Sequence, residues 1–368
     1  MFGGHSCMQK MNGYLTQMAS KRLSWLDDAK MFAMLSVILS HCYPINLIGV
    51  DTVGGVIVSF NMQLFMFLAG YTSAKSLECI SDWNLYWHYI VKIALHLLLP
   101  SYAIGALQAL ITLDPAAISN EQWFLKMLFR YLLVFASVNW LAMELNKRLN
   151  KDGISGPLPL WLSIFRYILF AVLMFVLSKT KLPEFAFYFL TGYLLKKHKL
   201  LESIVSSFNS RSSMPIMLSI QITALFLTIF TWHKCYGYNF YDEPFWALFE
   251  KNETIIFVYR QICGFGWIIL LVPLFILFSK KYTLFSYWGS KSLGLYITHT
   301  FIIHTVIERF DIVYPNDWRG WSIVIAITIL LTIASMLLIK LFESNRFTHF
   351  LFLGGGMEVL NKEAGRNK

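Results

Sequence analysis

Charged residues are scarce in this chain. They make up 14% of its 368 residues, whereas hydrophobic residues make up 57%, and the mean hydropathy is +0.55. Soluble domains carry roughly a quarter charged residues. So few polar side chains cannot cover a water-soluble globule of this size. The composition therefore excludes a soluble domain and predicts an integral membrane protein that crosses the bilayer several times.

Paired cysteines and targeting signals are missing as well. The five cysteines are scattered along the chain and form no C-x-x-C pair, so neither a disulfide framework nor a metal site is expected. The first 24 residues contain no apolar core of the signal-peptide kind, so we expect no cleaved signal. The net charge of +10 comes without a basic stripe interleaved with aromatic residues, and no nucleic-acid partner is expected.

What the chain does contain is a series of apolar windows, which predicts an all-α, polytopic membrane protein of about ten transmembrane helices. The windows cover residues 27–48, 53–74, 86–112, 123–142, 160–178, 183–196, 214–232, 254–278, 286–307 and 320–343. The sixth window is short for a span, so a re-entrant or interfacial helix is the alternative there.

The basic residues of the loops predict an orientation. If the N-terminus lies inside, most loop lysines and arginines also lie inside, among them Lys196, Lys197 and Lys199. Cytoplasmic loops are enriched in these residues, so both termini are expected in the cytoplasm. The predicted parts are a cytoplasmic segment at 1–26, one membrane domain at 27–343 and a cytoplasmic tail at 344–368.

Several ionisable side chains lie inside the windows. A charge at the bilayer centre costs on the order of 3 kcal/mol on insertion scales, so such groups usually face a cavity or a partner. Those near predicted span ends can extend to the interface and need no function; they are Lys126, Arg166, Lys291 and Lys340. Those further inside are Lys30, Lys92, Arg130 and Arg260, with His41, His96, His299 and His304.

The first window carries the most informative pair, in the stretch KMFAMLSVILSH from Lys30 to His41. Eleven residues span three helical turns plus about 20°, so both side chains share one face, about 16 Å apart along the axis. Asp27, three residues before Lys30, can pair with it as an orienting carboxylate. The pair offers a cation for an anionic cytosolic ligand and an imidazole for proton transfer. A snorkelling lysine above a packed histidine explains the spacing equally well.

Five blocks in order along the chain resemble the membrane acyltransferase 3 family. The stretch at 22–41, RLSWLDDAKMFAMLSVILSH, is similar to its first span, in which a basic residue and ten others precede a histidine. The other four resemble its second, third, fourth and late motifs. They are FNMQLFMFLAGY at 60–71, HLLLPSY at 96–102, WFL at 123–125 and GSKSLGLYITHTFII at 289–303.

This resemblance implies a multi-pass enzyme of a cell membrane, such as a bacterial inner or plasma membrane. The enzyme would move an acyl group, usually acetyl, from cytosolic acyl-CoA to a hydroxyl of a carbohydrate. Surface polysaccharide, exopolysaccharide and lipid-linked sugar are the acceptors that it implies. The expected partners are the lipid bilayer, acyl-CoA as co-substrate and the carbohydrate acceptor, with no bound cofactor.

The resemblance also assigns roles to residues. His41 is the candidate catalytic histidine, Lys30 its basic partner, and His299 matches the late histidine. Lys92 and His96 are candidates for donor binding, beside Lys30. Arg260, which enters its window from the outside, and His299 are candidates for contact with the acceptor or with the oxyanion. Cys42, next to His41, points about 100° away and makes a poor local dyad.

Three departures from the family pattern leave alternatives open. His96 stands where many members have arginine, Gln63 where many have proline, and Ala69 where many have serine. Lys92, one turn before His96, can supply the missing charge. A transporter or flippase of a lipid-linked or acylated glycan is one alternative, although no halves with matched broken helices are visible. A non-catalytic relative of the enzyme is the other.

Overall fold

The computed structural model describes residues 23–44, 47–120, 122–149, 158–177, 185–201, 203–204, 214–235, 253–279, 284–310 and 312–355. Within these ranges the regular structure is entirely helical, as predicted. The predicted N-terminal segment up to Arg22 and the tail from Gly356 lie outside the described residues, so the predicted division into three parts stays a prediction.

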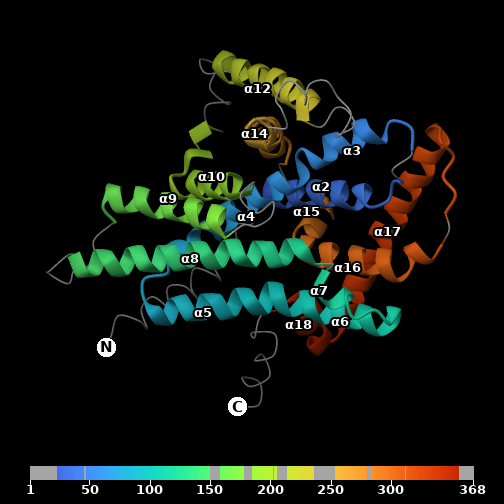
Figure 1. Cartoon of the computed structure of the whole chain (residues 1–368), viewed down its shortest axis with the longest axis horizontal. Coiled ribbons are helices and arrows are strands. Elements are labelled where there is room, and N and C mark those ends of the chain that lie inside the picture. The colour runs from blue at the N-terminus through green and yellow to red at the C-terminus, as the bar shows by residue number, and fades with distance from the viewer. Residues whose placement is uncertain are drawn as a thin grey trace.

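Figure 1 shows the order of the helices along the chain. Up to α8 they are α2 (Ser24–Ser40), α3 (Val50–Val58), α4 (Asn61–Glu78), α5 (Trp83–Ile93), η1 (Ala94–Leu98), α6 (Leu99–Thr112), α7 (Ala117–Asn120) and α8 (Trp123–Leu149). After α8 they are α9 (Leu160–Val176), α10 (Ala186–Lys197), α12 (Met214–Cys235), α14 (Glu253–Phe278), α15 (Leu284–Gly289), α16 (Ser292–Thr305), η3 (Ile307–Arg309), α17 (Trp318–Ser344) and α18 (Arg346–Leu353).

Six helical stretches of the described residues are long and apolar enough to cross a membrane. They are Thr52–Glu78, Trp83–Thr112, Trp123–Leu149, Pro215–Trp232, Phe257–Phe278 and Trp318–Ser344. Only 17% of the fourth stretch is buried inside the protein, so most of its apolar surface needs a lipid environment. Several of the other predicted windows contain shorter helices, such as α9, α10 and α16. The predicted total of ten spans and their direction across the membrane therefore stay predictions.

The first predicted span is wrong at its end. The window extends to residue 48, but α2 ends at Ser40 and the chain turns at His41 and Cys42. Pro44 explains the break, because a proline disfavours helical geometry at the residue before it. His41 caps the helix with φ −91° and ψ −6°, so it keeps its helical phase relative to Lys30 while sitting at the end of the helix.

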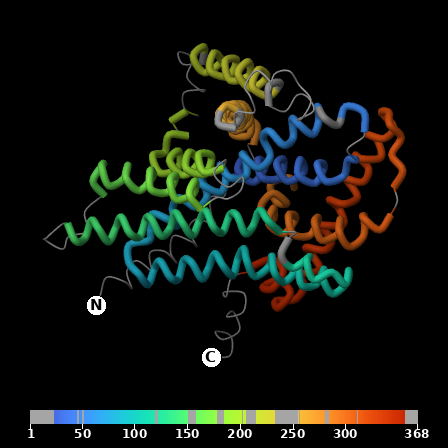
Figure 2. The backbone as a smooth tube through the Cα atoms, viewed as in Figure 1, coloured from blue at the N-terminus to red at the C-terminus, as the bar shows by residue number. Residues whose placement is uncertain are grey.

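α2 is the central helix of the bundle. It packs against α4, α14, α15, α16 and α17, which surround it in Figure 1. Figure 2 shows α14 nearly end-on while α5 and α8 lie across the view, so the helices cross one another rather than forming a parallel bundle. α15 approaches α2 most closely: a Cβ at Gly289 would lie 1.8 Å from the carbonyl oxygen of Asp27.

α4 and α10 cross at two glycines. A Cβ at Gly70 would lie 2.0 Å from the backbone oxygen of Phe189, and one at Gly192 would lie 2.0 Å from that of Phe67. Only a residue without a side chain allows backbones to approach this closely, as is common where membrane helices pack. This crossing places the basic end of α10 beside the last turns of α4.

Candidate functional site

The structure brings together two histidines predicted from distant parts of the sequence. The ring centroids of His41, at the end of α2, and His299, in α16, lie 5.5 Å apart with the planes tilted by 54°. The His41 side chain is exposed, whereas His299 is fully buried. The pair therefore has an accessible member that a substrate can reach and a buried member that supports it from inside.

His299 is held in place by its own helix and by a ring neighbour. Its Nδ1 lies 2.9 Å from the backbone oxygen of Leu295, which accepts a hydrogen bond from the protonated nitrogen. Its Nε2 is buried and has no hydrogen-bond partner among the described residues. The ring of Tyr296 packs against it at 5.6 Å, edge to face. A buried nitrogen of this kind is costly unless something in the working site uses it.

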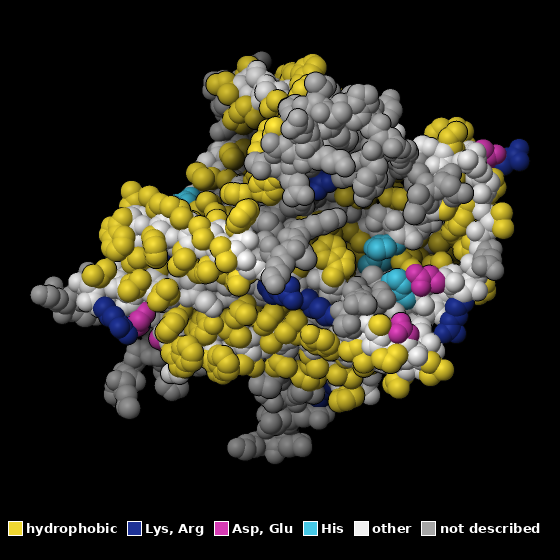
Figure 3. All heavy atoms as spheres, viewed as in Figure 1, with side chains coloured by type: hydrophobic (Ala, Val, Ile, Leu, Met, Phe, Trp, Pro, Cys, Tyr) yellow, Lys and Arg dark blue, Asp and Glu magenta, His cyan; other side chains and the backbone are white. Residues whose placement is uncertain are grey.

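A third histidine follows His299 by five residues on α16. Nδ1 of His304, in the last turn of α16, lies 2.7 Å from Oε1 of Glu308 in η3. Figure 3 shows histidine and acidic side chains gathered in a hollow on the side of the molecule where α16 and α17 lie. The sequence analysis missed Glu308, although a histidine and a glutamate four residues apart in sequence is a pattern that often indicates such a pair.

The predicted pairing at the start of α2 is confirmed. Nζ of Lys30 lies 3.6 Å from a carboxylate oxygen of Asp27, whose side chain is buried. The next residue, Asp28, was not predicted; it accepts hydrogen bonds from the hydroxyls of Ser279 and Ser286, at 2.5 Å for the latter. These contacts tie the start of α2 to α14 and α15, and hold Lys30 about three helical turns from His41.

The predicted donor-binding residues Lys92 and His96 lie on the helices that pack against α8. A π-helical turn, η1, separates α5 from α6 and contains His96. Nδ1 of His96 lies 2.8 Å from the backbone oxygen of Gly354, so its ring holds the end of α18. Lys92, on the preceding turn, is exposed and carries its charge to the surface. Single-turn π-helices occur often at functional sites.

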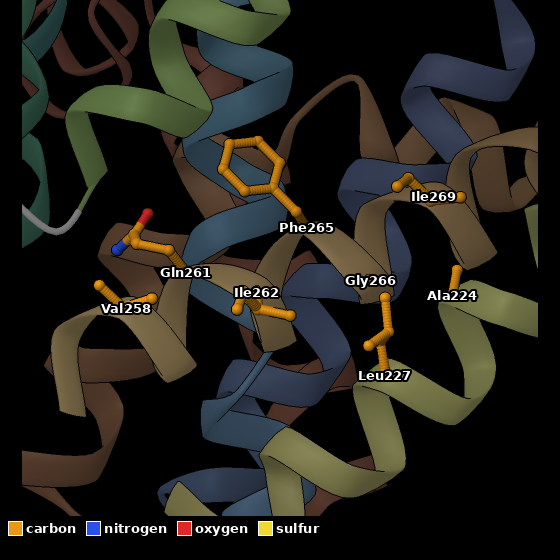
Figure 4. A pocket seen from close by; sticks show the side chains of 8 residues that line it. All are labelled: Ala224, Leu227, Val258, Gln261, Ile262, Phe265, Gly266 and Ile269. Carbon is orange, nitrogen blue, oxygen red and sulfur yellow. The ribbon is translucent and has the colours of Figure 1, made fainter. Parts of the chain in front are cut away.

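Arg260 lies half-buried in α14, which packs against α2 and α4. Its backbone oxygen accepts a hydrogen bond of 3.1 Å from the hydroxyl of Tyr188 in α10. Beside it, α12 and α14 enclose an almost wholly apolar groove of about 310 Å³ (Figure 4). The groove is lined by Ala224, Leu227, Val258, Gln261, Ile262, Phe265, Gly266 and Ile269. None of the predicted site residues lines it.

Arg166 corrects the sequence prediction most clearly. It was expected near a span end with its charge at the interface, yet it lies within α9 with its side chain 1% exposed. Its guanidinium donates to Asn139, to Glu78 at 3.0 Å, and to the hydroxyls of Tyr167 and Tyr193. Lys197 pairs with the same carboxylate at 3.3 Å. The burial follows from the polar partners that α4, α8 and α10 supply, because a paired charge can stay inside.

No group of three or more histidine, cysteine or acidic side chains is placed to hold a metal ion in the part of the chain that the structure describes.

Comparison with known proteins identifies the fold that carries this site. The family model of the membrane acyltransferase 3 proteins, described as an acyltransferase domain, matches residues 23–340, which is well over half of the chain. The match begins just before α2 and ends within α17, so it contains every predicted site residue. Neither a curated protein nor a solved structure matches the chain.

Proposed function

The chain belongs to the membrane acyltransferase 3 family, and from that premise we propose that it is an O-acyltransferase of a bacterial plasma membrane. In this proposal it moves an acetyl group from cytosolic acetyl-CoA to a hydroxyl of a cell-surface or lipid-linked carbohydrate, such as an exopolysaccharide. Membership of the family supports the transfer of an acyl group by a membrane protein. The identities of the acyl donor and of the carbohydrate acceptor are our proposal.

The observation that carries the proposal is the contact between His41 and His299. An exposed imidazole suits a general base because the ring can reach a substrate, and the buried ring of His299 packs beside it. The same residue closes the stretch that resembles the first family motif, so geometry and sequence favour the same histidine.

In the proposed reaction, His41 removes the proton from the acceptor hydroxyl as its oxygen attacks the acyl carbon. The carbon–oxygen bond forms, the carbon–sulfur bond breaks, and the proton passes from His41 to the leaving thiolate. A general base of this kind contributes typically 100- to 10,000-fold to a rate. A covalent acyl-histidine intermediate is the alternative route through the same residue.

The donor would bind along α2. The phosphates of acyl-CoA are anionic and stay on the cytoplasmic side, where we assign Lys30, with Asp27 orienting it, and Lys92 and His96 as further donor-binding residues. Lys30 and His41 lie about 16 Å apart along the helix, a distance that the long pantetheine arm can span. Arg260 and His299 are assigned to the acceptor or to the oxyanion that forms during attack.

The experiment uses membranes that contain the full chain, incubated with radiolabelled acetyl-CoA. We expect label in the membrane glycan with the wild type and at least a 100-fold loss with His41→Ala at unchanged protein abundance. His88→Ala, which removes an exposed histidine of α5, is the matched control and should transfer normally. Transfer retained in His41→Ala would overturn the role of His41. Movement of unmodified glycan without any label would identify a transporter instead.

A further inference from the structure

The helix that carries His299 has a second face beside the one that meets α2. The ring of His299 lies 5.5 Å from that of His41, measured between ring centroids. Tyr296 and Thr300 are four residues apart on α16, so they share one face of this helix. Thr300 directly follows His299, and neighbouring residues of a helix point about 100° apart. Tyr296 and Thr300 are therefore placed to contact a different neighbour from α2.

The start of α8 contacts this second face at two points. Nε2 of Gln122, the residue before α8, donates a hydrogen bond of 2.5 Å to Oγ1 of Thr300. The ring of Phe124, in the first turn of α8, packs against that of Tyr296 at 5.6 Å. Figure 1 shows the start of α8 next to α16. The hydrogen bond and the ring contact together restrict both the position and the rotation of α16 relative to α8.

The hydrogen bond between Gln122 and Thr300 lies in the interior. Gln122 is 1% exposed and Thr300 is 3% exposed. The hydroxyl of Thr300 donates to a backbone oxygen of its own helix, at 3.0 Å to Ile297, so its oxygen can accept from the amide. The other end of that amide, Oε1 of Gln122, is buried without a hydrogen-bond partner among the described residues. Burying it costs free energy that an apolar residue would avoid, so the glutamine calls for a functional explanation.

We propose that Gln122, acting through Thr300, is a positioning residue that holds the ring of His299 beside His41. The inference rests on the proposed acyltransferase function and deepens it by adding a third helix, α8, to the support of the site. Without the hydrogen bond, α16 can shift slightly against α8, and His299 moves with it because it adjoins Thr300 in the chain. A displacement of about 1 Å at a reacting group can lower a rate about 100-fold. The ring contact with α8 remains, so we expect a smaller effect here.

The test measures transfer from radiolabelled acetyl-CoA in membranes that contain Thr300→Val, Thr300→Ser or Gln122→Leu. Valine keeps the shape of threonine without its hydroxyl, whereas serine keeps the hydroxyl. The control is Thr305→Val, because Thr305 is a buried residue of the same helix whose hydroxyl donates to a backbone oxygen within that helix. We expect Thr300→Val and Gln122→Leu each to lower the maximal rate roughly 5- to 20-fold at an unchanged KM for acetyl-CoA. Thr300→Ser should retain most of the rate.

A double variant separates this positioning role from a general loss of stability. If both residues act through one hydrogen bond, Gln122→Leu combined with Thr300→Val should be no slower than the slower single variant, whereas independent effects multiply. Multiplied losses would overturn the inference, and so would a change confined to KM or a loss of rate that only follows a loss of folded protein. Equal rates for Thr300→Val and Thr305→Val, beside a wild type that transfers label, would overturn this inference alone. A wild type that transfers no label would overturn the acyltransferase proposal and the inference with it.

Discussion

The rings of His41 and His299 lie with their centroids 5.5 Å apart, although the residues come from nearly opposite ends of the chain. Their meeting depends on α16 packing against the end of α2. Because α2 stops at Ser40, His41 stands at an accessible helix end rather than in the middle of a buried span. A substitution at His299 therefore tests directly whether this buried ring supports the function of His41.

Replacing His299 with phenylalanine keeps a ring in the buried space and removes both nitrogens. We expect acyl transfer to fall about 10- to 100-fold while the protein remains folded, since no new polar atom is buried. The control is His349→Phe, which changes a half-buried histidine of α18. Initial rates of label transfer at equal protein abundance measure the effect, and a wild-type rate in His299→Phe would contradict a supporting role.

Replacing Lys30 with alanine should weaken the use of acetyl-CoA. A hydrogen bond to a charged group is worth about 1.5–3 kcal/mol, so we expect KM for acetyl-CoA to rise roughly 10-fold or more at a nearly constant maximal rate. Lys30→Arg keeps the charge and should retain most of the affinity. Arg148→Ala, at an exposed site on α8, is the control. An unchanged donor dependence in Lys30→Ala would argue against phosphate binding at this lysine.

Arg166 should be a stability residue rather than a catalytic one. Arg166→Ala leaves the buried side-chain oxygen of Asn139 without a donor and removes one of the two cationic partners of Glu78, which still pairs with Lys197. We expect a loss of about 1–3 kcal/mol. Arg166→Lys should rescue little, because an ammonium cannot reproduce the planar fork of donors. Thermal unfolding in detergent measures the loss. A melting temperature equal to that of Arg148→Ala would show that the buried network contributes nothing.

The crossing of α4 and α10 predicts that Gly70 tolerates no side chain. In Gly70→Ala the new Cβ would lie 2.0 Å from the backbone oxygen of Phe189, so the helices must separate, at a cost of about 3 kcal/mol. Gly294→Ala is the matched control, because its Cβ would meet only side-chain atoms, at 3.2 Å. We expect the first variant to lose folded protein in membranes and the second to keep it. Normal abundance of Gly70→Ala would contradict the close crossing.

Local patterns predicted the features that depend on neighbours in sequence. The three-residue spacing of Asp27 and Lys30 predicted an ion pair, and it is present. Hydropathy predicted an all-helical membrane protein, and the ordered motifs predicted the family, which the family model confirms. The break after Ser40 was also readable in principle, because Pro44 marks it. The i, i+4 spacing of His304 and Glu308 carried a similar signal.

The sequence by itself determined the membrane class, the family and the helix face shared by Lys30 and His41, because composition and helical periodicity depend only on residue order. The tertiary structure alone decided what surrounds these residues. The packing of α16 against α2 placed His299 beside His41, and polar side chains from α4, α8 and α10 allowed Arg166 to be buried. Such contacts join residues far apart in the chain, and no local pattern encodes which helices will meet.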